Sequence, residues 1–151
     1  MSQATKQQLD AMAVADGLRP TLLRLARELR QERIAGVSPH QVGLLISIKY
    51  APGVTVGQLA AEERVSTAAM SKRVSRLERD GLVARTPSEA DRRRKGLTLT
   101  EDGQRALRRV RSRRTAWLAS RLSALSPAEL AAVGAAAEPL ARLLERAGAR
   151  V

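Results

Sequence analysis

The sequence has no cysteine and only one histidine, His40, among its 151 residues. Without cysteine, the chain has no disulfide, no thiolate metal ligand, no cysteine nucleophile and no thiol-based peroxide sensor. A single histidine argues against a histidine-cluster metal site and against a histidine-based catalytic triad. The sequence also contains no recognisable pair of catalytic carboxylates and no phosphate-binding glycine loop. We therefore expect no metal, no cofactor and no enzymatic activity.

Aromatic residues and long apolar segments are scarce as well. Tyr50 and Trp117 are the only aromatic residues, which argues against proteins that stack single-stranded bases on aromatic side chains. No apolar run approaches the roughly 20 residues that a membrane-spanning helix needs, and the polar start MSQATKQQLD lacks an apolar signal segment. We expect a soluble, cytoplasmic protein without a membrane partner.

Basic residues, in contrast, are abundant. Lysine and arginine number 27 against 15 acidic residues, which gives a formal charge of +12 at pH 7. Such an excess predicts an anionic partner, either nucleic acid or an anionic membrane surface. The charge is concentrated in residues 64–95, which hold ten basic and four acidic residues. A local concentration of this kind favours a defined binding surface over a general compositional bias.

Helical spacing dominates the first part of the chain. Leucines at positions 18, 22, 25 and 29 predict a helix that runs to about Ile34, with Gly36 after its end. We expect Pro20 to start, kink or interrupt this helix. Three shorter helices follow, at about 39–50, 56–63 and 66–80. Their start signals are Ser38 with Gln41, Thr55 with Gln58, and Ser66.

A hairpin and two longer helices complete the predicted order of elements. LVART at 82–86 and the alternating GLTLT at 96–100 predict two short strands joined by a basic tip. Thr100 then caps a helix that runs to about Leu122, and SPAE at 126–129 starts another. This last helix carries an apolar seam for a partner helix, at Leu130, Val133, Ala137, Leu140 and Leu144.

The central helix–turn–helix–hairpin order predicts a winged helix-turn-helix, so the fold class is mainly α with a small β-hairpin wing. The helix at 66–80 begins with small polar side chains, which allow a helix end to approach base edges in a major groove. The candidate DNA-contacting residues on it are Thr67, Ala68, Ser71, Lys72, Arg73, Ser75 and Arg76. The alternative interpretation is an ordinary amphipathic helix with a solvated basic face.

The hairpin tip adds a second candidate surface. Arg92, Arg93 and Arg94 are placed to enter the minor groove beside the major-groove helix, because that narrow groove attracts arginine. Asp91 has the wrong charge for a phosphate contact, but a carboxylate can hold a guanidinium in a fixed direction before DNA binds. The alternative interpretation is that these charged side chains are exposed to solvent and bind no DNA.

The stretch DRRRKGLTLT resembles the wing signature of the MarR family of bacterial regulators, Asp-x-Arg, five residues, then Leu-Thr. Asp91, Arg93, Leu99 and Thr100 fill those places, and QLAAEERVSTAAMSKRVSRLERDGLVART resembles the helix-turn-helix of the same family. The resemblance implies one MarR-type domain over residues 1–151. Its winged helix-turn-helix would span about 38–100, with dimerisation helices at about 9–34 and 101–147.

The same resemblance implies a homodimer that binds a palindromic operator in double-stranded DNA, with Arg93 as the minor-groove arginine and Asp91 as its brace. It also implies a repressor released by a small phenolic or anionic effector ligand. The lack of cysteine excludes the mode of regulation in which family members sense oxidation, and the single histidine argues against zinc sensing. The scarcity of aromatic residues weakens the case for an aromatic ligand. Tyr50 and His40 could line a pocket, but residues of these types are more often packing residues.

One feature of the residues themselves supports a dimer: the terminal helices carry apolar stripes that the small central elements cannot cover. A twofold dimer would place the two copies of the helix at 66–80 about 34 Å apart, one turn of DNA. Two other functions stay open: a non-specific architectural or ribosome-associated nucleic-acid-binding protein, and a helical adaptor that docks an acidic protein through its basic face.

Overall fold

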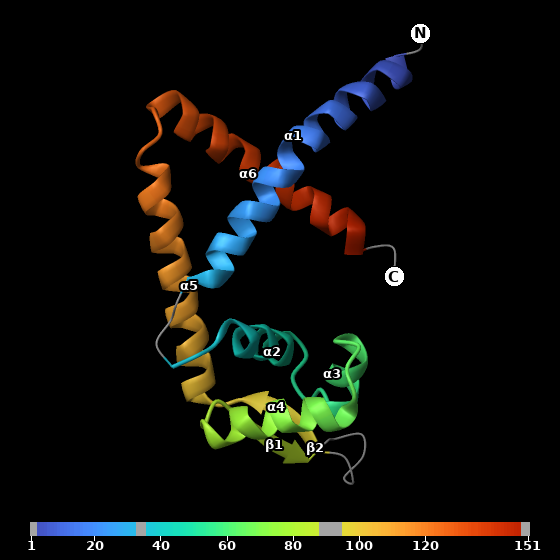
Figure 1. Cartoon of the computed structure of the whole chain (residues 1–151), viewed down its shortest axis with the longest axis vertical. Helices are drawn as coiled ribbons and strands as arrows, with labels where there is room; N and C mark the ends of the chain where they lie inside the picture. The colour runs from blue at the N-terminus through green and yellow to red at the C-terminus, as the bar shows by residue number, and fades with distance from the viewer. Residues whose placement is uncertain (1–2, 33–35, 88–94, 149–151) are drawn as a thin grey trace. The chain divides into compact units, whose positions relative to one another are not determined.

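The computed structural model describes residues 3–32, 36–87 and 95–148 and divides the chain into two compact units, residues 1–114 and 115–151. It confirms a mainly helical fold with one two-stranded antiparallel hairpin (Figure 1). The elements in chain order are α1 (Gln3–Gln31), α2 (Pro39–Tyr50), α3 (Val56–Glu62), α4 (Thr67–Arg79), β1 (Val83–Pro87), β2 (Lys95–Leu99), α5 (Glu101–Leu122) and α6 (Pro127–Gly148).

Helix α1 is longer and more regular than the sequence indicates. It begins at Gln3 and continues without a break through Pro20 to Gln31. Our expectation that Pro20 would start or interrupt the helix was therefore wrong. Proline removes one backbone hydrogen bond and crowds the preceding turn, and in a helix of 29 residues the remaining turns preserve the helical backbone.

The predicted caps of the three short helices are confirmed. The Ser38 hydroxyl accepts from the Gln41 amide at 3.3 Å, and the Gln41 side chain accepts from the Ser38 amide at 2.9 Å. Thr55 and Gln58 form the same reciprocal pair at 3.2 and 2.9 Å. These bonds satisfy amides that a helix start leaves unpaired, so local sequence alone sets where α2 and α3 begin.

One apolar core joins α2, α3, α4, the hairpin and the start of α5. The exposed fraction is 0% for Leu59, Leu77 and Leu97, which come from three of these elements. Full burial of such a side chain contributes about 1.5–3 kcal/mol. The buried hydrophobic residues are Val37, Val42, Leu44, Leu45, Ile48, Val54, Leu59, Ala60, Met70, Val74, Leu77, Leu82, Val83, Leu97, Ala106 and Val110.

The hairpin pairs Val83 with Leu99 and ends at Pro87 opposite Lys95. Both strands lie one residue away from the predicted limits, and Thr100 belongs to the cap of α5 instead of the second strand. The segment before α3 pairs with β2 as well, because the Leu97 amide donates to the Val54 carbonyl at 2.8 Å. Gly96 permits this approach, since a Cβ there would lie 2.6 Å from the Gly53 carbonyl oxygen.

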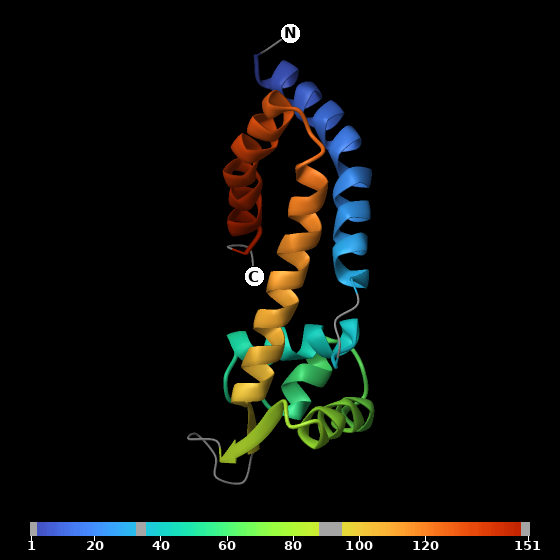
Figure 2. The same ribbon diagram turned by 90° about the vertical axis from the view of Figure 1, so that its left-hand side faces the viewer.

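Helices α5 and α6 have the predicted starts. The Thr100 hydroxyl accepts from the Gly103 amide at 3.0 Å, and Figure 2 shows α5 continuing directly from the end of β2. Ser126 and Glu129 form the capping pair of α6, which continues unbroken through Pro139. No residue of α6 with a described side chain is buried, and Val133 in the predicted seam is 48% exposed.

Candidate nucleic-acid interface

Helix α4 has one buried face and one face that is open to a partner. Met70, Val74 and Leu77 are fully covered, as the sequence predicts for its core stripe. Of the seven predicted contact residues on this helix, five are exposed and two, Ser71 and Arg73, are half-buried. The exposed ones are Thr67, Ala68, Lys72, Ser75 and Arg76.

The beginning of α4 is chemically suited to a negatively charged groove. The Ser66 hydroxyl accepts from the Ala69 amide at 3.1 Å and fixes the first turn. Thr67 and Ala68 follow, so the side chains nearest the helix start are small. A small-residue helix start brings backbone amides and short hydroxyl groups close to DNA, while Lys72 and Arg76 one and two turns later add positive charge.

The end of α4 is held by side chains from other elements that the sequence did not reveal. Arg85 of β1 donates to both carboxylate oxygens of Glu78, at 2.8 and 3.1 Å. This two-point geometry fixes direction as well as distance. The root of the wing is thereby tied to the last turn of α4.

A second tie reaches the same end of α4 from α2. The Gln41 side chain, which already caps α2, donates from Nε2 to the Asp80 carboxylate at 3.0 Å. Asp80 is the C-cap of α4, and Gly81 follows with φ of +72°, a conformation that glycine adopts without strain. Helix α4 is therefore fastened at its C-terminal end, whereas its N-terminal half is held through its apolar face.

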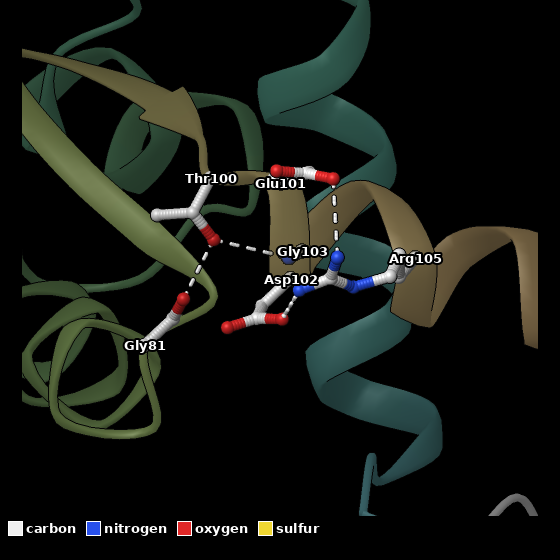
Figure 3. A network of polar contacts seen from close by, with 6 residues as sticks. All are labelled: Gly81, Thr100, Glu101, Asp102, Gly103 and Arg105. Carbon is white, nitrogen blue, oxygen red and sulfur yellow. Dashed lines mark hydrogen bonds and ion pairs between the residues drawn. The ribbon is translucent and has the colours of Figure 1, made fainter.

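The third tie comes from the junction between β2 and α5. The Thr100 hydroxyl donates to the Gly81 carbonyl at 2.6 Å while accepting from the Gly103 amide (Figure 3). In the same turn, Arg105 pairs with the carboxylates of Glu101 and Asp102, and the Asp102 hydrogen bond raises the pKa of Arg105. The first turn of α5 is thus locally ordered where it meets the end of α4.

An open cleft of about 650 Å³ lies between the start of α3 and the base of the wing. Arg85 and Lys95 supply its positive charge, and Gln58 supplies a polar side chain. The remaining lining residues are Thr55, Val56, Gly57 and Ala61. This cleft places the basic side chains of the wing stem beside the start of α3.

The predicted contacts at the wing tip, Asp91, Arg92, Arg93 and Arg94, lie outside the described residues. What the structure places is the stem on either side of them, from Val83 to Pro87 and from Lys95 to Leu99. The stem is joined to the recognition helix by the Arg85–Glu78 pair.

The described residues contain no cluster of three or more histidine, cysteine or acidic side chains arranged to hold a metal ion. None of the described helices is long and apolar enough to cross a membrane. Tyr50 and His40 are both exposed, Tyr50 by 79%, so neither is a core packing residue in the single chain.

Comparison with known proteins agrees with this geometry. Residues 35–94, which span α2 to the wing, match the family model described as MarR family. The HTH-type transcriptional repressor MdtR of Bacillus subtilis is 31% identical over 123 residues, which cover 82% of this chain and 76% of MdtR.

Two solved structures show the same fold over nearly the whole chain. A putative transcriptional regulator from Pseudomonas aeruginosa is 32% identical, with a TM-score of 0.74 over 90% of this chain and 96% of its own. Streptococcus pneumoniae FabT, solved in complex with DNA, is 26% identical, with a TM-score of 0.53 over 93% and 98% of the two chains. The chain therefore belongs to the MarR family and is a DNA-binding transcriptional regulator, not an enzyme.

Proposed function

We propose that the protein is a cytoplasmic repressor that binds a palindromic operator as a homodimer. One MarR-type domain, residues 1–151, would carry this function, and its DNA-binding part would span about 38–100. The observation that supports it most is the exposed, small-residue start of α4 beside a basic wing stem. The relative MdtR is named a repressor, which supports the same direction of regulation.

In this proposal α4 lies in the major groove. Thr67 and Ser71 hydrogen-bond to bases or phosphates, and Ala68 contacts a thymine methyl group. Guanine or the flanking phosphates are reached by three cations, Lys72, Arg73 and Arg76. Ser75 contacts the sugar-phosphate backbone of the DNA. Half-burial of Ser71 and Arg73 leaves part of each side chain accessible, so both stay in the proposed contact set.

The wing would enter the neighbouring minor groove. We assign Arg93 to the groove floor, Arg92 and Arg94 to its phosphate walls, and Asp91 to bracing the Arg93 guanidinium. The support is the charge of the segment and the tie between its stem and α4 through Arg85 and Glu78. A stem fixed to the recognition helix would present both surfaces to DNA in one orientation.

The dimer would be built by α1, α5 and α6, at about 9–34 and 101–147. Its support is the apolar surface that α1 and α6 leave exposed in the single chain. Soluble monomers rarely expose extended apolar surface of this kind. The large exposed residues are Leu9, Met12, Val14, Leu22, Leu23, Leu25, Leu130, Val133, Leu143 and Leu144.

A small phenolic or anionic effector would release the repressor from DNA. The support is membership in the family, and no pocket residue is assigned. Titration of the protein–operator complex with salicylate, a small phenolic anion, tests this part. A saturable loss of operator binding with unchanged non-specific binding is expected, and no loss at millimolar concentration would contradict it.

The direct experiment for DNA recognition is selection of bound duplexes from a random pool, at physiological salt because phosphate contacts weaken steeply with ionic strength. The proposal predicts an inverted repeat whose halves lie about one helical turn apart. A non-specific architectural or ribosome-associated protein would instead enrich no sequence, or would prefer RNA. An adaptor for an acidic protein would retain no duplex at all.

A further inference from the structure

The elements that share the apolar core, α2 to the first half of α5, are called the DNA-binding unit below. The junction of four chain segments in this unit has a geometry that its role as a helix cap does not require. Beyond its bonds to Gly81 and Gly103, Thr100 donates its backbone amide to the Leu82 carbonyl at 3.1 Å. The Leu82 amide in turn donates to the Leu77 carbonyl at 2.9 Å, which joins β1 to the end of α4. A continuous chain of hydrogen bonds therefore runs from α4 to the first turn of α5. Figure 3 shows its last part, from Gly81 through the Thr100 hydroxyl to Gly103.

Gly103 makes this junction closer than any other residue type would allow. It is buried within the first turn of α5, and a Cβ built there would overlap the Leu82 carbonyl oxygen and lie 3.1 Å from its carbonyl carbon. Glycine weakens a helix by about 1 kcal/mol relative to alanine. Helix propensity therefore opposes glycine at this position, and close packing of α5 on the α4–β1 turn accounts for it.

We propose that Thr100 and Gly103 are positioning residues that set the direction in which α5 leaves the DNA-binding unit, and through it the spacing of the two operator halves. This inference rests on the proposed homodimer and its palindromic operator. The two residues would touch no DNA. They would act through α5, which is one continuous helix from Glu101 to Leu122 and would carry part of the dimer interface.

The size of the effect follows from the length of α5. An added Cβ at Gly103 would require the two segments to separate by about 1 Å, given an ordinary carbon–oxygen contact of about 3.3 Å. Over one helical turn of about 5.4 Å this is a tilt of about 10°, and over the 22 residues of α5 it displaces the far end by about 6 Å. Base pairs are about 3.4 Å apart, so the preferred spacing should change by about one or two base pairs.

The test uses the inverted repeat selected by the wild-type protein, resynthesised with its central spacer shortened or lengthened by one and two base pairs, together with an isolated half-site. Gly103→Ala should bind the original spacing at least tenfold more weakly and bind best at an altered spacing. Its affinity for the half-site should stay within about twofold of wild type, because α4 and the wing are unchanged. Bivalent binding is sensitive to geometry in this way.

The matched glycine control is Gly43→Ala. Gly43 lies in α2, is exposed, and would bring an added Cβ within 4 Å of nothing. This variant should keep the wild-type spacing preference. A Gly103→Ala dimer with the wild-type spacing optimum would overturn the inference.

A second pair of variants covers the case in which Gly103→Ala does not fold. Thr100→Val removes the hydroxyl at nearly constant shape, whereas Thr100→Ser keeps it. Thr100→Val should accept a broader range of spacings, and Thr100→Ser should restore the narrow range of the wild type. Identical spacing profiles for both variants and wild type would overturn the inference.

The experiment distinguishes a failure of the proposed function from a failure of the inference. If the wild-type protein selects no inverted repeat, the proposed function is contradicted and the inference falls with it. If the wild type selects a repeat with one preferred spacing and the Thr100 and Gly103 variants keep that spacing, only the inference is wrong.

Discussion

The DNA-binding unit and the terminal helices use apolar residues in opposite ways. The buried hydrophobic residues all lie between Val37 and Val110, in α2 through the first half of α5. Helix α1 buries none of its residues, and α6 buries none of those with described side chains, although both are rich in leucine and alanine. One region therefore completes its core within a single chain, whereas the two terminal helices leave their apolar side chains exposed.

In the proposed function, the first region recognises DNA and the second assembles the dimer. A unit with its own core can hold α4 and the wing stem in place without help, as the ties at Glu78, Asp80 and Gly81 indicate. Helices with exposed apolar stripes need cover, and in the proposed function a second copy supplies it. Four predictions test the contrast, beginning with the largest expected effect.

Truncation inside the core should be the most damaging change. Leu77→Ala removes a side chain that is fully buried in α4, and such changes lower the free energy of unfolding by about 2–5 kcal/mol. Denaturant unfolding followed by circular dichroism measures the loss, which should not depend on protein concentration. A loss that appears only on dilution would show that this core, too, depends on a second chain.

A charge in the seam of α6 should act on assembly instead. Val133→Glu places a carboxylate at a half-exposed seam position, and loss of a central interface contact costs about 2 kcal/mol, or roughly 30-fold in dimer affinity. Sedimentation equilibrium measures it. Ala135→Glu, on the opposite side of the same helix by helical periodicity, is the control and should leave the dimer intact. Equal behaviour of the two variants would contradict the assignment of the seam.

Removal of the proposed minor-groove arginine should weaken DNA binding without changing either core or assembly. Arg93→Ala is expected to cost about 1–3 kcal/mol on the selected operator. Arg108→Ala, an exposed arginine on α5, should act mildly and equally on all duplexes. Arg113 is a poorer control because it pairs with Glu32 at 3.0 Å. Fluorescence anisotropy on specific and scrambled duplexes measures both, and comparable losses from the two variants would favour non-specific binding.

The smallest effect concerns the start of α6. Hydrogen bonds from the Ser126 hydroxyl and then its amide lower the pKa of Glu129 below the ordinary glutamate range. Because the folded-state pKa is lowered, the stabilisation is present above the unfolded pKa of glutamate and is lost as pH falls through the lower folded-state pKa. Ser126→Ala should raise the pKa of Glu129 in an NMR titration. An unchanged pKa would mean that the capping pair is not formed in solution.

Much of this architecture could be predicted because its signals are local. The pairs Ser38–Gln41 and Thr55–Gln58 lie three residues apart, so the sequence itself displays both partners of each cap. The limits of α4 and the starts of α5 and α6 follow from the same kind of signal. The hairpin was predicted with strands one residue off, because alternation alone does not separate the last strand residue from a helix cap.

The ties that orient the site could not be predicted, because their partners are far apart in the sequence. Gln41 and Asp80 are 39 residues apart, and Thr100 and Gly81 are 19 residues apart. Nothing in a local pattern identifies such partners. The approach of Gly103 to Leu82 is equally hidden, since a glycine in a helix start gives no indication of what packs against it.

The central claim is that a second copy of the chain covers the apolar faces of α1 and α6. Native mass spectrometry of the DNA-free protein at micromolar concentration tests it most directly, against a chain mass of 16.3 kDa. The account predicts a dominant species of twice that mass, which Val133→Glu shifts toward the single chain. A wild-type protein found at the mass of a single chain would contradict it.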